Sequence, residues 1–347
     1  MMKDFYRKIF GCSIALLILL VAVPSYGAEK VISLRLAHFM PTTSDQVILS
    51  QEWAKEVEKR TGGRVKITVY PGSTLMPVAQ TYDGVTKGVT DIGFGIFTYH
   101  RGRFPLTEVI DLPLGYKTGY FATKMVNEYY KKFKPKELDD VKVLFLECHG
   151  PGFVHTRKSV TKLEDLKGMK IRSSGLSAKI VSALGASPVS LPVTEAYDAL
   201  AKGVAEGITL PDDGIMIWGL KDVVKYHVRH WGSSYTSAFY TDMNKQKWES
   251  LPKDIQEIID KLDEEWIEKT AIMWEKYEEK AREYLRKNGN TFVELTKEED
   301  ARWASLMKPI IADYVKTTKE KGLPGDQALQ FCQDYLKKND KFDYMKK

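Results

Sequence analysis

Apolar and polar residues follow two different spacings near the start of the chain. Apolar residues alternate with polar ones over residues 32–37 and again over 65–70, which predicts two β-strands. Between them, apolar residues recur at helical spacing, starting after Ser44 or Asp45 and ending at the glycines of residues 61–63, which predicts a helix. Because two strands separated by a helix usually pair side by side, this order predicts a parallel sheet.

A second stretch, residues 164–210, repeats this pattern. A turn at Lys167-Gly168 precedes a short strand over 169–172, a helix that Ser177 caps, a second strand around Val189, a helix that Thr194 caps, and a final strand over 208–210. Arg172 therefore stands at the carboxyl end of a strand, just before a helix.

Ligands bind at that end of the strands in open α/β sheets. An arginine there can hold a carboxylate through two parallel hydrogen bonds. The alternative is that Arg172 pairs with a surface carboxylate.

The two halves of the chain contain a weak internal repeat. Residues 82–91 and 197–206 each predict a helix that closes in a Lys-Gly turn, and a short apolar piece follows each, over 92–97 and 208–210. Two copies are too few for a solenoid, so the repeat predicts two similar lobes, with chance similarity of helix ends as the alternative. Ligand sites are common in the cleft between two lobes.

The remaining segments connect and complete these lobes. We predict a strand over 141–146, a hinge at 149–152, a strand from 154, a strand or strand pair over 230–240, a helix over 253–287, a strand over 291–295 and helical structure from 297. The expected fold is α/β and two-lobed, like a periplasmic binding protein, with a hinge, a cleft and a long helix that spans both lobes. Residues 31–150 plus 234–277 form lobe one, and 151–233 plus 278–347 form lobe two.

The first residues read as a targeting segment. Lys3, Arg7 and Lys8 precede an unbroken apolar run over 14–23, and small residues follow near Gly27. This pattern is typical of a signal peptide over residues 1–27. The run is shorter than the roughly 20 apolar residues that a membrane-spanning helix needs, which disfavours an uncleaved anchor. We therefore predict a protein exported to the periplasm.

Charge and cysteine content change this interpretation little. The 347-residue chain carries a formal net charge of +6, with both signs mixed along it. No basic stripe suited to nucleic acid is present in the sequence. Beyond the leader, Cys148 and Cys332 could pair in an oxidising compartment, but Cys148 lies in an apolar run, so we expect free thiols.

The sequence offers little support for catalysis or a cofactor. Cys148 and His149 are neighbours, and adjacent strand residues point to opposite faces. His227 and His230 could share a helical face and bind a metal, yet no third ligand has a suggestive spacing. Asp212-Asp213 could coordinate a cation together with a substrate. No glycine-rich phosphate loop occurs, and we predict neither a catalytic site nor a cofactor, and assign no metal ligand.

Several segments in a fixed order resemble the solute-binding proteins of TRAP transporters, the DctP family. They are Lys-Gly-Met-Lys-Ile-Arg at 167–172, Leu-Gly-Ala-Ser-Pro-Val at 184–189 and Glu-Ala-Tyr-Asp-Ala-Leu-Ala-Lys-Gly-Val-Ala-Glu-Gly at 195–207. The resemblance extends from about residue 34 to 316. It implies a periplasmic, non-enzymatic receptor that captures an organic acid through Arg172 and delivers it to a small and a large membrane subunit. We expect a monomer.

The chain departs from polar members of that family at positions that the resemblance places near the ligand. Leu210 stands where many members have Asn, and Phe39 also replaces an Asn. The predicted binding residues are Arg172, Phe39, His38, Ile96, Phe97, Tyr99, Val154, His155, Leu210 and Trp231. Since these are mostly apolar, we predict an apolar monocarboxylate, such as an aromatic acid or a branched-chain 2-oxo acid, over a sugar acid or a dicarboxylate.

Two other functions stay open at this point. A binding protein for an ABC importer or a sensor kinase would share the fold, and genes for membrane subunits nearby would discriminate. A secreted hydrolase is the third possibility, although no nucleophile with a positioned histidine supports it.

Overall fold

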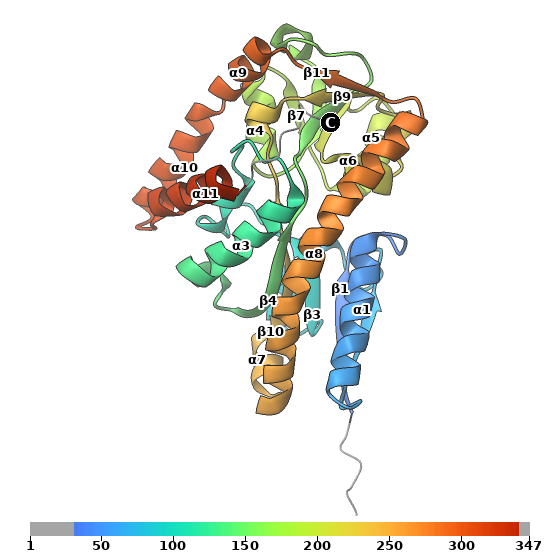
Figure 1. Cartoon of the computed structure of the whole chain (residues 1–347), viewed down its shortest axis with the longest axis vertical. Helices are drawn as coiled ribbons and strands as arrows, with labels where there is room; N and C mark the ends of the chain where they lie inside the picture. Colours follow the sequence, from blue (N-terminus) through green and yellow to red (C-terminus); the bar gives the residue numbers. More distant parts are fainter. Residues whose placement is uncertain (1–30, 340–347) are drawn as a thin grey trace, which may run out of the picture.

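The computed structural model describes residues 31–339 (Figure 1). The predicted signal peptide, residues 1–27, lies outside the described residues. The chain forms two sheets, whose strand orders are β2-β1-β3-β10-β4 and β11-β9-β5-β8-β6-β7. These two sheets with their helices are the two predicted lobes, so the predicted fold class is confirmed.

The first sheet combines a parallel part with one reversed strand. β1 (Ile32–His38) pairs in parallel with β2 (Val65–Tyr70) and β3 (Ile92–Ile96), as the strand–helix–strand order predicted. α1 (Asp45–Arg60) connects β1 to β2, and Ser44 caps it by accepting a hydrogen bond from the backbone of Val47 at 3.3 Å. β10 (Ala238–Asn244) returns from the second lobe and lies antiparallel between β3 and β4 (Val141–Cys148).

The second sheet contains the segment that carries Arg172. Its strands are β5 (Phe153–Thr156), β6 (Lys170–Ser173), β7 (Ser187–Ser190), β8 (Gly207–Leu210), β9 (Tyr226–Arg229) and β11 (Thr291–Glu294). β6 leads into α4 (Ser177–Ala183), and β8 leads into α6 (Asp212–Ile217). Since β6 and β8 are parallel neighbours, the residues after both strands meet at one edge of the sheet.

The internal repeat corresponds to equivalent structure in the two lobes. α2 (Thr81–Thr86) precedes β3, as α5 (Ala196–Ala201) precedes β8. The glycines that close the two helices, Gly88 and Gly203, have φ values of 69° and 74°, a left-handed conformation that glycine adopts without strain. The same turn chemistry therefore ends both helices.

Three sequence predictions need correction. Ser177 does not cap the helix after β6, because it is the first residue of α4 and the capping position before it is Leu176, whose side chain makes no capping hydrogen bond. Residues 230–240 are not one strand, because a 3₁₀ turn at Trp231–Ser233 separates β9 from β10, and Ser234 Oγ donates to the Tyr116 carbonyl at 2.6 Å within this connection. The helix capped by Thr194 instead begins with a 3₁₀ turn at Val193–Glu195. Tyr197, in the helix α5 that follows this turn, is 49% exposed.

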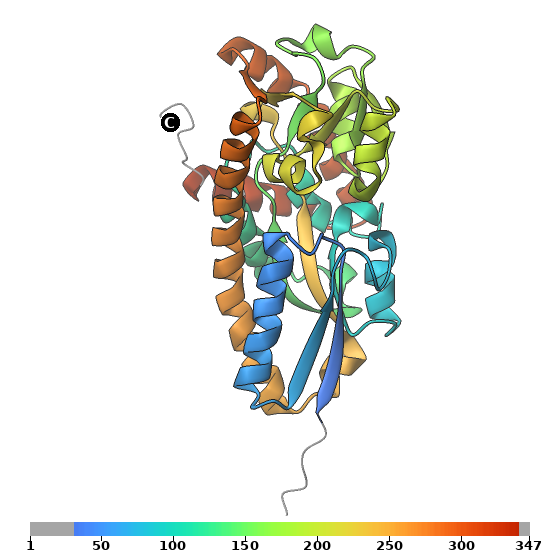
Figure 2. The same cartoon turned by 90° about the vertical axis from the view of Figure 1, so that its right-hand side faces the viewer.

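The long helix predicted over 253–287 is confirmed as α8 (Lys253–Lys287). Its 35 residues span ~52 Å at about 1.5 Å per residue. α8 packs against α1 and α3 (Gly119–Phe133) in the first lobe and against α6 in the second. It runs along most of the long axis of the molecule, with α7 (Lys245–Glu249) at one end (Figures 1 and 2). One rigid element therefore contacts both lobes.

The C-terminal region forms three helices instead of continuous helical structure. They are α9 (Lys297–Ser305), α10 (Lys308–Glu320) and α11 (Gly325–Asn339). α11 packs on α10 and on α3, and the hydroxyl of Tyr314 in α10 donates to the Leu106 carbonyl at 2.9 Å. Part of the segment that we assigned to lobe two thus contacts lobe one.

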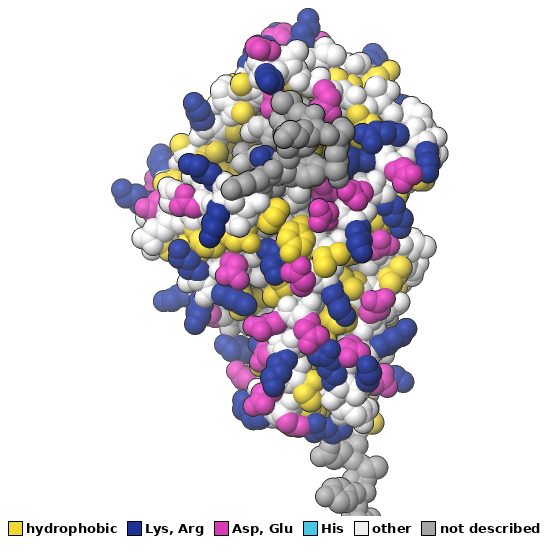
Figure 3. Space-filling model, in the orientation of Figure 1, with side chains coloured by type: hydrophobic (Ala, Val, Ile, Leu, Met, Phe, Trp, Pro, Cys, Tyr) yellow, Lys and Arg dark blue, Asp and Glu magenta, His cyan; other side chains and the backbone are white. Residues whose placement is uncertain are grey.

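Surface and cysteine features agree with the sequence analysis. Cys148 and Cys332 are both buried free thiols. On the face in Figure 3, positive and negative side chains are interspersed over the surface. Within residues 31–339, no helix combines the length and the apolar character required to cross a bilayer.

Candidate functional site

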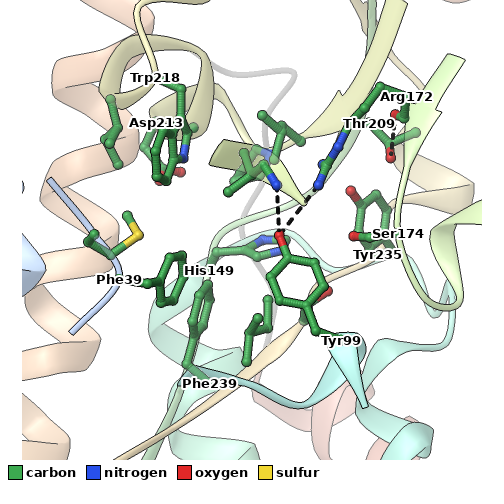
Figure 4. Close-up of a pocket in the computed structure, with 18 of the residues that line it drawn as sticks. Phe39, Tyr99, His149, Arg172, Ser174, Thr209, Asp213, Trp218, Tyr235 and Phe239 are labelled. Atoms are coloured by element: carbon green, nitrogen blue, oxygen red, sulfur yellow. Dashed lines mark hydrogen bonds between the residues drawn. The ribbon is translucent and has the colours of Figure 1, made fainter. Parts of the chain in front are cut away.

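A pocket lies between the two lobes, lined by residues from the loops and strands of both (Figure 4). It comprises about 540 Å³ of space between atoms, including its opening to solvent. Its walls include Phe39, Met40, Ile96, Tyr99, His149, Arg172, Ser174, Val193, Thr209, Leu210, Pro211, Asp213, Gly214, Ile217, Trp218, Tyr235, Ser237, Phe239 and Trp274.

Arg172 brings a buried positive charge to this pocket. Its side chain comes from β6 and the residue is 1% exposed. Nε and Nη2 both donate to the Leu191 carbonyl, at 3.0 and 2.8 Å, which fixes the guanidinium plane. Among residues 31–339, no carboxylate forms an ion pair with it, and no hydrogen bond engages Nη1. Because an unpaired buried charge is costly, the site favours an anion.

Tyr99 joins the lobes beside this arginine. It ends the 3₁₀ turn Phe97–Tyr99 that follows β3. Its hydroxyl oxygen accepts hydrogen bonds from the Val193 backbone at 3.0 Å and from Arg172 Nη2 at 3.4 Å (Figure 4). The hydroxyl hydrogen remains available, so Tyr99 can donate to an anion that Arg172 holds.

Aromatic rings form the opposite part of the pocket. Phe239 lies between Phe39 and Trp274, with ring centroids 6.3 and 5.5 Å away and planes inclined by 11° and 25°. Trp218 and Ile217 of α6 also face this space. Such walls bind a flat apolar group through burial and ring contacts.

Two titratable side chains complete the lining. Burial and the neighbouring Asp212 raise the pKa of Asp213 to about 8. Burial lowers the pKa of His149 to about 4, so its ring is neutral near pH 7. The Nδ1–H group of His149 donates to the Gly150 carbonyl at 2.5 Å, which leaves Nε2 as an acceptor.

The structure brings together five of the ten residues predicted from the sequence. Phe39, Ile96, Tyr99, Arg172 and Leu210 line the pocket. All five lie at or just after the carboxyl ends of strands β1, β3, β6 and β8. This is where the topology of an open α/β sheet gathers a site.

His38 and Phe97 lie outside the pocket, contrary to our expectation. The His38 ring stacks on Phe94 with centroids 4.0 Å apart, and its Nδ1 accepts from the Met40 backbone at 3.2 Å. Phe97 points into the core against Phe104 and Tyr240. Each adjoins a residue that does line the pocket and points the other way.

Val154, His155 and Trp231 also lie elsewhere. Val154 and His155 are buried in β5, an inner strand of the second sheet rather than part of the loop after the hinge. Trp231 packs edge-on against Phe153, with ring centroids 4.9 Å apart.

His155 instead belongs to a buried polar cluster. Its Nδ1 lies 2.6 Å from His227 Nδ1, and its Nε2 lies 2.7 Å from the Leu210 carbonyl. Asp212 is adjacent but pairs with Arg229 at 2.7 Å. Two metal-bound nitrogens at tetrahedral geometry would stand roughly 3.3 Å apart, so the cluster fits a hydrogen-bonded chain. His230 is not part of it, because His227 and His230 do not share a helix and His230 Nδ1 contacts Ser233 Oγ at 2.9 Å.

Sequence reasoning missed several residues of the site. Phe239 and Trp274 come from β10 and α8, where only the three-dimensional fold brings them near Arg172. Asp213 was considered only as part of a cation site with Asp212, and Trp218 was not predicted. The position of both could have been inferred, because α6 follows the carboxyl end of β8 and the rule used for Arg172 applies there too.

Comparison with known proteins places this pocket in a family. Residues 36–318 match the sequence pattern of the bacterial extracellular solute-binding proteins, family 7. The chain belongs to this DctP family. Together with the structural matches below, this makes it a TRAP-type periplasmic solute-binding receptor for organic acids, not an enzyme.

Two similar solved structures are TRAP solute-binding proteins with aromatic ligands. One, from a marine metagenome, is specific for aromatic acids and holds metahydroxyphenylacetate; it is 30% identical, with 89% of this chain and 100% of that chain covered and a TM-score of 0.85. Another, from Rhodoferax ferrireducens, holds copurified benzoate; it is 28% identical, with 89% and 99% covered and a TM-score of 0.83.

A curated DctP-family relative has a different named ligand. The C4-dicarboxylate-binding periplasmic protein of Rhodobacter capsulatus is 26% identical over 314 residues, which cover 88% of this chain and 92% of the relative. Family membership therefore does not define the ligand, which has to be inferred from the residues that line the pocket.

Proposed function

We propose that this receptor binds an aromatic monocarboxylate, with its carboxylate on Arg172 and its ring between the aromatic walls. The observation that carries the proposal is the buried guanidinium of Arg172, which has no carboxylate partner among residues 31–339. A bound carboxylate would neutralise it and accept further hydrogen bonds from Nη1 and Tyr99.

The remainder of the pocket decides between classes of acid. A second carboxylate of a dicarboxylate would find no second cation in the pocket lining and would face Asp213. The hydroxyls of a sugar acid that face Phe39, Trp218 and Phe239 would lose water without a hydrogen-bond partner on these rings. An aromatic ring is the group that this surface accommodates at least cost. The aromatic ligands of the two similar structures support the same choice.

Export and delivery complete the proposed function. The segment over residues 1–27 would direct the chain to the periplasm and be removed, and the receptor would pass its ligand to a small and a large TRAP membrane subunit. Of the ten residues predicted from the sequence, this proposal keeps five as ligand contacts: Phe39, Ile96, Tyr99, Arg172 and Leu210. A monomeric receptor remains our prediction.

A thermal-shift screen tests the proposed ligand class. The panel contains benzoate, phenylacetate, mandelate, a branched-chain 2-oxo acid, succinate and glucuronate. A ligand at a thousand times its dissociation constant stabilises a protein by about 4 kcal/mol, so binding is readily detected. We expect stabilisation by the aromatic acids. Stabilisation by succinate or glucuronate alone would contradict the proposal.

A further inference from the structure

The two ends of the pocket carry opposite chemistry. Arg172 enters from β6, and Asp213 enters from the first turn of α6. Figure 4 shows the two side chains on opposite sides of the pocket, with Phe39, His149 and Phe239 below the space between them. A ligand held by its carboxylate at Arg172 would direct its far end toward Asp213.

Asp213 has no partner within the protein that explains its position. It is 2% exposed, its Oδ1 is fully enclosed without a hydrogen bond, and within the described part of the chain its carboxyl is bonded by its own backbone N–H and by no other residue. The preceding residue differs, because Asp212 pairs with Arg229 at 2.7 Å. Enclosing a polar group without a partner is costly, and in residues 31–339 Asp213 is the one acidic side chain that lines the pocket.

The surroundings of Asp213 define the group that it can recognise. Asp212 places a like charge beside it, and the opposite charge of Arg282 acts more weakly. A hydroxyl group suits a carboxyl in either protonation state, because it donates to an ionised carboxylate and can also accept from a protonated one.

We infer that Asp213 hydrogen-bonds a hydroxyl group at the end of the ligand remote from its carboxylate, so that the preferred substrates are hydroxylated aromatic monocarboxylates. This inference rests on the proposed function, in which Arg172 holds the carboxylate. Asp213 is then a specificity residue: it favours a ligand with a hydroxyl over one with an apolar far end. The aromatic walls select the ring, and Asp213 selects its substituent.

The test compares matched ligands by isothermal titration calorimetry. Benzoate and phenylacetate are each measured beside their 3- and 4-hydroxy derivatives and the corresponding fluoro derivatives, because fluorine adds size without a donor. We expect at least one hydroxy acid to bind wild-type protein about tenfold more tightly than its parent and its fluoro analogue. A difference below threefold for every hydroxy acid would overturn the inference.

Two variants test whether the preference for a hydroxyl group depends on Asp213. Asp213→Leu removes both oxygens at similar size, and the hydroxyl preference should fall below threefold. Asp198→Asn is the matched control, since Asp198 is exposed on α5 of the same lobe and pairs only with Lys202 among the described residues. It also removes one carboxylate, so it controls for the change in net charge. A tenfold preference that persists in Asp213→Leu would also overturn the inference.

The outcomes separate this inference from the proposed function. If the parent acids bind but no hydroxyl preference exists, the role of Asp213 is wrong and the proposed function stands. If no aromatic acid binds, both are wrong. Cooperative thermal unfolding checks that Asp213→Leu folds, and the wild-type ligand series decides the question even if that variant does not.

Discussion

At the scale of single residues, binding depends on a cation placed in advance. Arg172 is buried and oriented by the Leu191 carbonyl before any ligand arrives. The protein therefore orders this side chain during folding and loses little side-chain entropy on binding. Its unpaired charge supplies the attraction.

Replacing Arg172 should weaken binding strongly. Arg172→Ala is expected to cost at least about 2 kcal/mol of binding free energy, because the bound carboxylate would lose its charged partner. Arg172→Lys should also bind poorly, since a point charge cannot reproduce the planar guanidinium. Calorimetry measures both variants, with Arg157→Ala as the control, because Arg157 is exposed in the same lobe. Near-wild-type affinity in both Arg172 variants would refute its role.

Strand geometry decides which residues of the site can be predicted from the sequence. The family resemblance, and not a local pattern, placed Tyr99 and Leu210 near the ligand; both line the pocket because they lie at or after the ends of parallel strands. His38 and Phe97 were wrong by one or two positions, because neighbouring residues at a strand end point to different sides. Trp274 lies in the middle of a long helix, and no local pattern distinguishes it from a core residue.

At the scale of elements, clear periodicity gave correct boundaries. The alternation over 65–70 and the helical spacing over 253–287 correspond to β2 and α8. The strand or strand pair predicted over 230–240 is only partly present, because a 3₁₀ turn at Trp231–Ser233 comes first and β10 begins at Ala238. Short-range pattern does not distinguish a strand from a buried connection, which only packing defines.

Tyr99 links the lobes, and its removal should weaken closure. Tyr99→Phe loses the bonds to Val193 and Arg172 and should reduce ligand affinity by about 1 kcal/mol. Solution scattering should show that ligand lowers the radius of gyration of the wild type, as in other hinge proteins. The variant should need more ligand for the same change.

The control for this experiment is Tyr70→Phe. Tyr70 lies in β2 of the first lobe, and its hydroxyl makes no hydrogen bond with the rest of residues 31–339. It should behave like the wild type. An unchanged scattering profile at saturating ligand in the wild type would contradict closure itself.

At the scale of the whole molecule, buried ionisable groups couple stability to pH. Burial raises the pKa values of Asp111, Glu147, Asp213 and Glu278 to about 8. It lowers the pKa values of His38 and other buried histidines. Below about pH 6.5, those histidines are protonated in the unfolded chain but remain neutral in the folded protein, so they make the free energy of unfolding rise with pH. The buried carboxyls make the free energy of unfolding fall as pH rises.

Between pH 6.5 and 8 the carboxyls dominate. The folded protein still binds protons on them, whereas the unfolded chain does not, so stability should fall as pH rises. Each group contributes up to about 1.4 kcal/mol per pH unit. Thermal unfolding should show a falling melting temperature, with a smaller slope for Glu147→Gln and an unchanged slope for the exposed control Glu257→Gln. A melting temperature that rises over this range would contradict the assignment.

The arrangement of the two lobes and α8 explains how the chain forms a binding pocket between its lobes. β10 joins the sheet of lobe one after the chain leaves lobe two, and α8 contacts both lobes. The pocket forms where both lobes meet, so ligand binding and lobe contact depend on the same residues, Arg172 and Tyr99.

The most direct test of the central claim is a crystal structure of the protein with the tightest aromatic acid from the screen. We predict a carboxylate oxygen within hydrogen-bond distance of Arg172 Nη1 and of the Tyr99 hydroxyl, and an aromatic ring against Phe39, Trp218 and Phe239. A ligand bound outside this pocket, or with its carboxylate away from Arg172, would contradict the account.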